Sequence, residues 1–258
     1  MRLVSLTCSN TEIVCALGCG HLLVGVDKHS DYPEEVVQKL PRVGPDLKIN
    51  IDKVAALKPD LVLASLTVPG HEKIVQALQQ AGLNSMAPEP ISLEDVYRDI
   101  LEIAEHLGVT PRGQRLVREM RDEIRAAEHS GPCLEVLVEW WPKPVIVPGK
   151  WSWVNDLLMA AGGSNPFSQR SVKSTPVTAE EVCAVDPDAV VISWCGVSPQ
   201  KYKRETVFRR EGWSHLEAVR QRRVFCIPEA FLGRPGPRLR HGYQSLCRII
   251  AECQSMGR

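Results

Sequence analysis

The chain has 258 residues, 44% of them hydrophobic, so it can bury one or two sizeable cores without needing disulfides or metals to fold. Lysine plus arginine equals aspartate plus glutamate at 31 each, which excludes the global positive field of a nucleic-acid binder. No apolar run approaches membrane-spanning length, so no membrane insertion is expected.

The first predicted lobe covers residues 1–107. Its strands and helices alternate along the chain, which favours a parallel sheet with helices on both faces. The elements expected here are a strand at Arg2–Leu6, a helix at Thr11–Leu17, a strand at Leu22–Val26 and a helix at His71–Ala81.

Residues 108–131 are predicted to bridge the two lobes. The segment from Pro111 to Glu128 is charged, begins with proline, and places Leu116, Met120 and Ile124 at helical spacing. Together with a helix predicted at Leu93–Leu107, it forms a long helical bridge.

The second predicted lobe covers residues 132–258 and repeats the alternation of the first. Its strands are predicted at Leu134–Glu139, Ala189–Ser193 and Arg223–Ile227, and its helices at Val154–Ala161 and Gly242–Met256. This pattern again favours an α/β lobe with a central parallel sheet.

One segment occurs twice in the chain. Residues Asp52–Ser65 return as Glu180–Ser193, at a constant offset of 128 residues. Each copy reads as a short amphipathic helix stopped by Pro-Asp, followed by a buried parallel strand that ends in serine. A single repeat at half-length spacing indicates two similar lobes with a cleft between them, rather than a solenoid.

The loops after the predicted strands carry aromatic residues rather than catalytic groups. In open α/β sheets ligands bind beyond the carboxyl ends of the strands, and flat apolar side chains there suit a large flat ligand. The aromatic residues of these loops are Tyr32, Trp151, Trp153, Trp194 and Phe231, and the last of them is followed by Arg234 and Arg238.

Several motifs occur in the order found in a known family. They are Ser9-Asn10-Thr11-Glu12, Ser30-Asp31-Tyr32-Pro33, Leu57-Lys58-Pro59-Asp60-Leu61-Val62, Gly149-Lys150 with Ala161-Gly162-Gly163-Ser164-Asn165, and Arg234-Pro235-Gly236-Pro237-Arg238. On these motifs the chain resembles the cobalamin-binding members of the class III substrate-binding proteins, which serve ABC importers. The resemblance implies two Rossmann-like lobes with central parallel sheets, joined by one long bridging helix, and a corrin ring in the cleft.

The resemblance also implies the residues of the site. Tyr32 and Phe231 match ring-contacting positions. Ser65 stands where the family has a tryptophan, and Trp151 and Trp153 in the facing loop are expected to compensate. Glu72 matches one of two glutamates that dock on the permease, and Gly233 stands where the second is expected. The predicted ligand-binding residues are Asn10, Tyr32, Ser65, Trp151, Trp153, Trp194, Phe231, Arg234 and Arg238.

Structural interpretations compete with some of these roles. Tyr32 could simply close a proline-anchored loop. Glu72, near a helix start, would stabilise the helix dipole without any partner. Either Trp140 or Trp141 is expected in the core, and Trp213 is expected to be a packing anchor.

The sequence therefore predicts a non-catalytic protein that holds cobalamin or another corrinoid, with no covalent cofactor and no metal site. A haem or ferric-siderophore binding protein is the alternative, with Tyr32 or His29 as axial ligand of haem and Arg234 or Arg238 facing its propionates. An intracellular corrinoid-handling enzyme or chaperone is the alternative of another class. Nucleophile-elbow, Walker and His-Glu metalloprotease motifs are absent from the sequence.

The location expected from the sequence is the cytoplasm. The first residues read as a strand rather than a signal peptide, and nine cysteines without framework spacing are typical of a reducing compartment. If the sequence is a trimmed mature form, a periplasmic or cell-surface location is the alternative. An ABC permease contacted through Glu72 is the expected protein partner.

Overall fold

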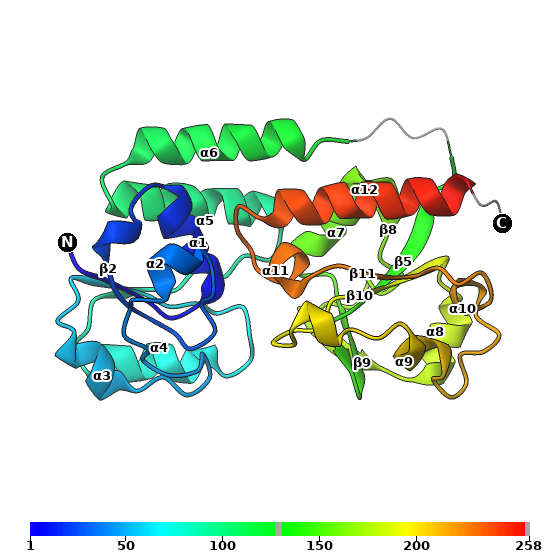
Figure 1. Cartoon of the computed structure of the whole chain (residues 1–258), viewed down its shortest axis with the longest axis horizontal. Coiled ribbons are helices and arrows are strands. Elements are labelled where there is room, and N and C mark those ends of the chain that lie inside the picture. Colours follow the sequence, from blue (N-terminus) through cyan, green and yellow to red (C-terminus); the bar gives the residue numbers. More distant parts are fainter. Residues whose placement is uncertain (127–130, 256–258) are drawn as a thin grey trace. The chain divides into compact units, whose positions relative to one another are not determined.

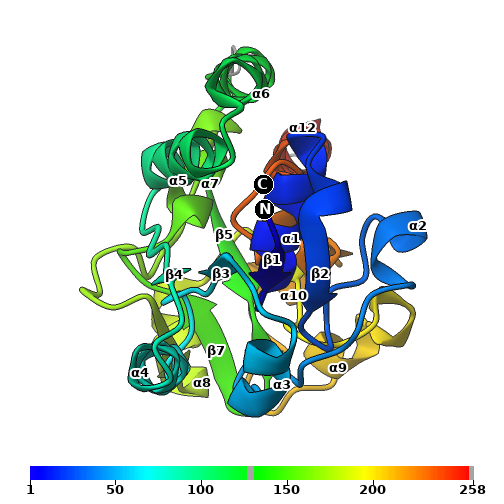
Figure 2. The same cartoon turned by 90° about the vertical axis from the view of Figure 1, so that its left-hand side faces the viewer.

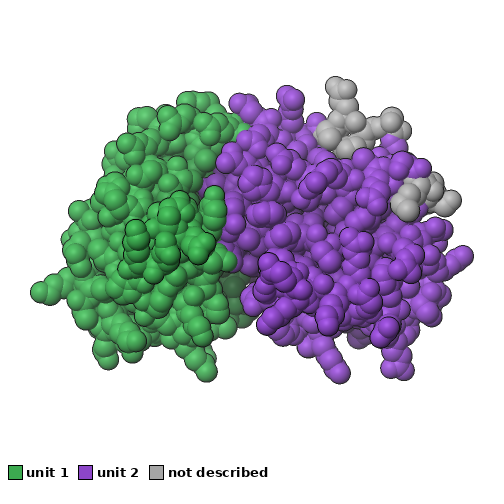
Figure 3. Space-filling model, in the orientation of Figure 1, with its two compact units in different colours: residues 1–90, 95–119 green, residues 91–94, 120–258 purple. Residues whose placement is uncertain are grey.

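The computed structural model describes residues 1–126 and 131–255. Figure 1 labels its helices and strands. The chain groups into two compact units, residues 1–90 with 95–119 and residues 91–94 with 120–258, which Figure 3 colours separately. The division falls inside a helix of the predicted bridge, and the three-part division at residues 107 and 131 stays a prediction.

Unit 1 contains a four-stranded sheet in the order β2-β1-β3-β4, with all neighbouring strands parallel. Figure 2 shows these strands side by side. The strands are β1 (Leu3–Ser5), β2 (Leu23–Val26), β3 (Leu61–Leu63) and β4 (Ser85–Met86). The helices between them are α1 (Cys8–Ala16), α2 (Glu34–Val37), α3 (Ile51–Ala56) and α4 (His71–Gln80), with a 3₁₀ turn at Gly20–Leu22.

The core of unit 1 follows from the alternation of side chains along the strands. Val4 of β1 and Val62 of β3 share one apolar cluster with Val54 of α3 and Leu78 of α4. Leu3, next to Val4, is fully buried on the opposite face of the sheet. The sheet is therefore buried on both faces, which explains its continuous apolar strands.

Two helices follow the sheet of unit 1: α5 (Leu93–His106) and α6 (Thr110–Glu123). Gly113 permits their close packing, because a Cβ there would lie only 2.5 Å from the Cβ of Ala104. Helix α6 ends at Glu123, earlier than the expected Glu128, which lies outside the described residues.

Unit 2 contains two sheets. The first is parallel, in the order β11-β10-β5-β8, and the second is antiparallel, in the order β6-β7-β9. The parallel strands are β5 (Leu134–Glu139), β8 (Gly163–Ser164), β10 (Ala189–Ile192) and β11 (Val224–Cys226). The antiparallel strands are β6 (Trp141–Pro142), β7 (Val145–Pro148) and β9 (Ser174–Val177), none of which is predicted from the sequence.

The helices of unit 2 begin at recognisable caps. The Ser152 hydroxyl accepts a hydrogen bond from the backbone N–H of Val154, and Thr178 forms a reciprocal capping box with Glu181. The helices are α7 (Trp153–Ala160), α8 (Ala179–Val185), α9 (Glu205–Phe208), α10 (Glu217–Arg220), α11 (Glu229–Leu232) and α12 (Leu239–Ser255), with a 3₁₀ turn at Pro199–Lys201.

The two copies of the sequence repeat also have the same local structure. It forms α3 and β3 in unit 1 and α8 and β10 in unit 2. Lys58 and Asp186, which stand at the same position of the repeat, both adopt the left-handed conformation, with φ of 49° and 42°. The backbone N–H of Asp60 then bonds to the carbonyl of Arg2, and that of Asp188 to the carbonyl of Glu135. The shared sequence therefore builds the same helix-to-strand turn in both units.

Candidate functional site

The connectivity of each sheet locates its candidate binding edge. Ligands of open parallel sheets bind beyond the carboxyl ends of the strands, where neighbouring strands connect to opposite sides. In unit 1 this point lies between β1 and β3, and in unit 2 between β5 and β10. We call these positions the unit 1 edge and the unit 2 edge.

At the unit 1 edge, Asn10 and Ser65 hold the backbone together. The Asn10 side-chain amide is 3% exposed and donates a 2.6 Å hydrogen bond to the carbonyl oxygen of Ala64. The Ser65 hydroxyl accepts from the backbone N–H of Thr67 and bonds to the Thr67 hydroxyl at 2.9 Å. Asn10 lies inside α1 rather than in a loop, so its amide links that helix to the end of β3.

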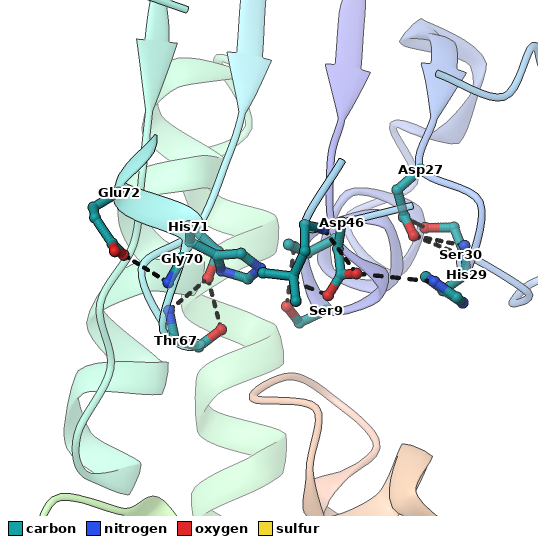
Figure 4. A network of polar contacts seen from close by, with 12 residues as sticks. Ser9, Asp27, His29, Ser30, Asp46, Thr67, Gly70, His71 and Glu72 are labelled. Atoms are coloured by element: carbon teal, nitrogen blue, oxygen red, sulfur yellow. Dashed lines mark hydrogen bonds and ion pairs between the residues drawn. The ribbon is translucent and has the colours of Figure 1, made fainter. Parts of the chain in front are cut away.

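The loop that carries Tyr32 is anchored by a buried aspartate. Asp27 follows β2, is fully buried, and accepts hydrogen bonds from the backbone N–H groups of His29 and Ser30, as Figure 4 shows. Burial raises the pKa of Asp27, and the bonds from Ser30 and His29 partly oppose that shift. Tyr32 itself is 48% exposed, so an ordered loop presents an accessible aromatic ring.

A small pocket opens at the unit 1 edge. Its free volume is about 10 Å³, which is room for one water-sized group. Leu6 and Ile74 supply apolar lining, and the polar lining comes from Thr7, Asp46, Ser65 and His71. Asp46 and His71 are functional candidates that the sequence did not reveal.

Asp46 lies between two histidines (Figure 4). One carboxylate oxygen is 3.8 Å from Nε2 of His29, and the other is 3.6 Å from Nε2 of His71. His71 lowers the pKa of Asp46 most strongly, burial opposes this shift, and His29 and the backbone N–H of Leu47 add to it. Asp46 is therefore an anionic hydrogen-bond acceptor at neutral pH.

At the unit 2 edge, a buried carboxylate is fully paired. Glu139 ends β5, is 0% exposed, and accepts two hydrogen bonds from the Arg210 guanidinium at 2.6 and 2.9 Å. The indole N–H of Trp194 donates to the same carboxylate at 2.8 Å. Trp194 is 6% exposed and packs edge-on against Tyr202. The predicted ligand contact at Trp194 is thus part of a polar framework beneath the edge.

Trp151 and Trp153 have different environments although one residue separates them. Trp151 is 42% exposed, and its backbone N–H bonds to the carbonyl of Val172. Trp153 is 9% exposed, and its indole donates a 2.7 Å hydrogen bond to the carbonyl of Leu232. Of the two, Trp151 has the surface that a ligand could cover.

The segment after β11 contributes a half-buried ring and two arginines. Phe231 lies 5.2 Å from the ring of His241, and the Arg238 guanidinium lies 5.6 Å from the centroid of Phe231. The Arg234 Nε donates to the Glu229 carboxylate at 3.2 Å. Both arginines are therefore held in place by neighbours of their own unit.

Glu72 lies exposed in the first turn of α4, where its carboxylate accepts a 2.8 Å hydrogen bond from the backbone N–H of Gly70. Backbone hydrogen bonds lower its pKa. The carboxylate is thus anionic and caps the helix start, which is the structural interpretation considered above.

The remaining tryptophans have the burial that was expected of them: one of Trp140 and Trp141 lies in the core, and Trp213 is a buried packing residue. Trp140 is 9% exposed while Trp141 is 41% exposed, and Trp213 is 1% exposed. Within residues 1–126 and 131–255, no group of three or more His, Cys, Asp or Glu side chains is arranged to hold a metal ion. The expectation that the predicted ligand contacts share one cleft stays a prediction.

Comparisons with known proteins agree with this architecture. Residues 3–231 match the family described as periplasmic binding protein. An uncharacterized ABC transporter substrate-binding lipoprotein of Bacillus subtilis, YvrC, is 31% identical over 96% of this chain and 79% of its own length.

Two solved structures are similar over nearly the whole chain. The periplasmic haem-binding protein RhuT of Roseiflexus, in apo form, has a TM-score of 0.84 and 27% identity, covering 98% of both chains. The periplasmic vitamin B12 binding protein BtuF of Vibrio cholerae has a TM-score of 0.80 and 25% identity, covering 98% of this chain and 97% of its own.

These relatives correct the expected location. A cytoplasmic protein was expected, but the similar proteins are periplasmic or lipoproteins, so that expectation is wrong. The cysteines misled because a buried thiol such as Cys19 or Cys253 acts as a small apolar side chain whatever the compartment. Among the helices that the structure describes, none has both the length and the apolar character to span a bilayer.

Proposed function

Because the chain belongs to the periplasmic binding protein family, we propose that it is the substrate-binding protein of an ABC importer and that its ligand is a corrinoid such as cobalamin. Its family and relatives give the coarser class, a non-catalytic binding protein for ligands of the B12 or haem type. The observation that carries the corrinoid proposal is the full-length similarity to the vitamin B12 binding protein BtuF.

The exposed aromatic residues support a large flat ligand. Tyr32 at the unit 1 edge and Trp151 in unit 2 are 48% and 42% exposed, and neighbouring hydrogen bonds order the loops that carry both. Covering one such ring with a ligand contributes on the order of 1–3 kcal/mol. Ordered loops also lose less conformational entropy on binding than flexible ones.

Haem is the second candidate ligand, because the haem-binding protein RhuT is as similar to this chain as BtuF is. Tyr32 or His29 would supply the axial ligand of the iron. Arg238 beside Phe231 would face a propionate.

We also propose that an ABC permease is the protein partner and that it contacts Glu72. The carboxylate is exposed and its pKa is lowered, so it is available as a fixed negative charge on the surface of unit 1. An arginine of the permease is the complementary group.

Titration calorimetry with cobalamin, cobinamide and haemin tests the ligand. We expect both corrinoids to bind in one-to-one complexes and to raise the unfolding temperature. Binding of haemin alone, with no heat and no thermal protection from either corrinoid, would refute the corrinoid assignment and favour haem.

Trp151→Ala tests the aromatic contact. The variant should bind cobalamin roughly tenfold more weakly, because about 1.4 kcal/mol of contact is lost. Trp141→Ala is the matched control, since Trp141 has almost the same exposure as Trp151, 41% against 42%, and lies in the same unit. Equal dissociation constants for the two variants would remove Trp151 from the site.

A further inference from the structure

The pocket at the unit 1 edge contains a buried polar group without a hydrogen bond. His71 is 3% exposed, and neither of its ring nitrogens has a hydrogen-bond partner. An Asp46 oxygen lies 3.6 Å from Nε2, which is longer than a hydrogen bond. Buried polar atoms are nearly always hydrogen-bonded, so His71 has bonding capacity that the protein alone leaves unused.

The side chain of His71 faces a second group with unused capacity. In Figure 4 the imidazole and the Asp46 carboxylate point toward one another. The Asp46 carboxylate is 34% exposed and accepts a hydrogen bond from the backbone N–H of Leu47 at 3.0 Å. A carboxylate has about four acceptor positions, so Asp46 can accept further hydrogen bonds. An unprotonated nitrogen of His71 is another acceptor.

Exposed apolar and aromatic side chains lie on the loops around these acceptors, alongside the polar His29. Tyr32, Leu47 and Val68 are exposed by 48%, 48% and 40% on the loops that surround the unit 1 edge. A Cβ on Gly70 would lie 3.2 Å from Leu47, which places that leucine beside the start of α4 and therefore next to His71. A few convergent polar groups beside exposed apolar side chains are typical of a ligand site.

We propose that this pocket is a subsite for a primary amide on a corrinoid side chain, an inference that rests on the proposed function. The amide NH₂ is close to water in size and has two N–H donors. One N–H bonds to the Asp46 carboxylate and the other to the unprotonated nitrogen of His71. The ligand thereby gives a hydrogen bond to an imidazole that has none in the free protein.

The same pocket rejects a carboxylate of equal size. A carboxylate has no N–H to donate, and its negative charge would lie beside that of Asp46, where like charges repel strongly because the site is partly desolvated. The subsite therefore discriminates an amide-bearing macrocycle, such as cobalamin, from a carboxylate-bearing one, such as haem. Asp46 and His71 determine specificity through this difference.

Two corrinoids test the proposal: cobinamide, which carries the side-chain amides, and cobyrinic acid, which carries carboxyl groups in their place. Calorimetry should show that the wild-type protein binds cobinamide at least about tenfold more tightly than cobyrinic acid. In Asp46→Asn this preference should fall by roughly tenfold, because the acceptor charge is lost. Haemin binding by the variant should be unchanged or tighter.

The control is Asp52→Asn, which removes an exposed carboxylate from α3 of the same unit and should leave the preference unchanged. His71→Leu is the second variant and should also reduce the preference, so the test does not depend on how Asp46→Asn folds. Thermal unfolding verifies that each variant is native.

Two results would overturn the proposal. Folded Asp46→Asn and His71→Leu proteins that keep the wild-type preference would refute the amide subsite while corrinoid binding stands. A wild-type protein that binds both corrinoids equally would refute it too. Failure of both corrinoids to bind, with haemin bound, would instead refute the proposed function itself, and the subsite with it.

Discussion

The parallel sheets of the two units have the same strand topology, but their binding edges carry different side chains. All six tryptophans and all four phenylalanines of the chain lie after residue 131, whereas the aromatic residues of unit 1 are Tyr32 and Tyr97. Tyr97 is buried, so Tyr32 is the ring that unit 1 can offer to a ligand. We therefore expect unit 2 to supply most of the aromatic contacts with the proposed flat ligand.

The polar groups of the two edges also differ. Glu139 in unit 2 is buried and bonded to both Arg210 and Trp194, so its acceptor capacity is used within the protein. Asp46 and His71 in unit 1 approach each other without a hydrogen bond. A satisfied network makes a rigid support, and an unsatisfied one is available for recognition. The comparison therefore assigns support to the unit 2 network and specificity to the unit 1 pocket.

The largest expected effect is a loss of stability when the hydrogen-bonded network of Glu139 in unit 2 is broken. Arg210→Met leaves Glu139 buried without its cationic partner, and removal of one partner of a buried pair costs about 3–5 kcal/mol of unfolding free energy. Urea unfolding followed by tryptophan fluorescence measures this loss, because every tryptophan lies in unit 2.

Two further variants make that measurement specific. Arg209→Met alters the neighbouring exposed arginine and should change stability by less than about 0.5 kcal/mol. Arg210→Met combined with Glu139→Leu removes both charges and should recover part of the loss, because the Trp194 indole N–H then lacks its acceptor. If Arg210→Met cost no more than Arg209→Met, Trp194 alone would be sufficient to hold Glu139.

The next largest expected effect is the pH dependence of stability that comes from Asp99, a buried acid that is more weakly paired than Glu139. Asp99 of α5 is 4% exposed, and the Arg98 guanidinium is 3.8 Å away. Burial raises its pKa to about 7; Arg98 opposes the shift, and Glu102 and Asp95 add to it. Since the folded pKa exceeds the unfolded value, the stability from Asp99 is complete below about pH 4 and is lost as pH rises through about 7.

The corresponding variant is Asp99→Asn, which resembles the protonated acid at every pH. The wild-type protein should lose on the order of 2 kcal/mol between pH 5 and pH 8 from this group, and the variant should not. Urea unfolding followed by far-UV circular dichroism at both pH values measures the difference. Asp122→Asn, on an exposed carboxylate of α6, is the control. The same pH slope in wild type and Asp99→Asn would contradict the raised pKa.

The elements of the fold that sequence predicts well are those fixed by local pattern. The strand at Leu134–Glu139 is confirmed residue for residue, and both copies of the repeat form the expected helix and strand. The antiparallel strands β6, β7 and β9 were missed, because β6 is only Trp141–Pro142 and β9 carries exposed residues where an apolar alternation would signal a strand.

The site is less predictable because burial of its side chains depends on distant partners. Trp153 and Trp151 look alike in sequence, yet Trp153 is fixed by a carbonyl 79 residues away. Trp194 is likewise fixed by a carboxylate 55 residues away. Asp46 and His71 meet only because α4 starts beside the loop of Asp46. None of these contacts leaves a local signal.

The smallest expected effect compares the two copies of the repeat at one position. Asp60 and Asp188 each follow the proline of their copy of the repeat. The Asp60 carboxylate accepts a hydrogen bond from the backbone N–H of Arg2 at 2.6 Å, and the Asp188 carboxylate accepts one from the backbone N–H of Glu135 at 2.8 Å. Asp60 has a side chain that is 60% exposed, whereas Asp188 is 5% exposed. Water can replace the carboxylate at Arg2 but not at Glu135, so burial should decide the cost of losing it.

Asp188→Ala should therefore destabilise unit 2 by about 2–3 kcal/mol, and Asp60→Ala should cost unit 1 about 0.5–1 kcal/mol. The difference of about 1–2 kcal/mol is the quantity to measure. Hydrogen exchange of the amides in β5 for Asp188→Ala, and in β1 for Asp60→Ala, reports each unit separately, because the two bonds end on those strands or next to them. Equal losses of protection in the two variants would contradict this prediction. They would mean that Asp60 and Asp188 contribute the same stability through the shared turn, whatever their burial.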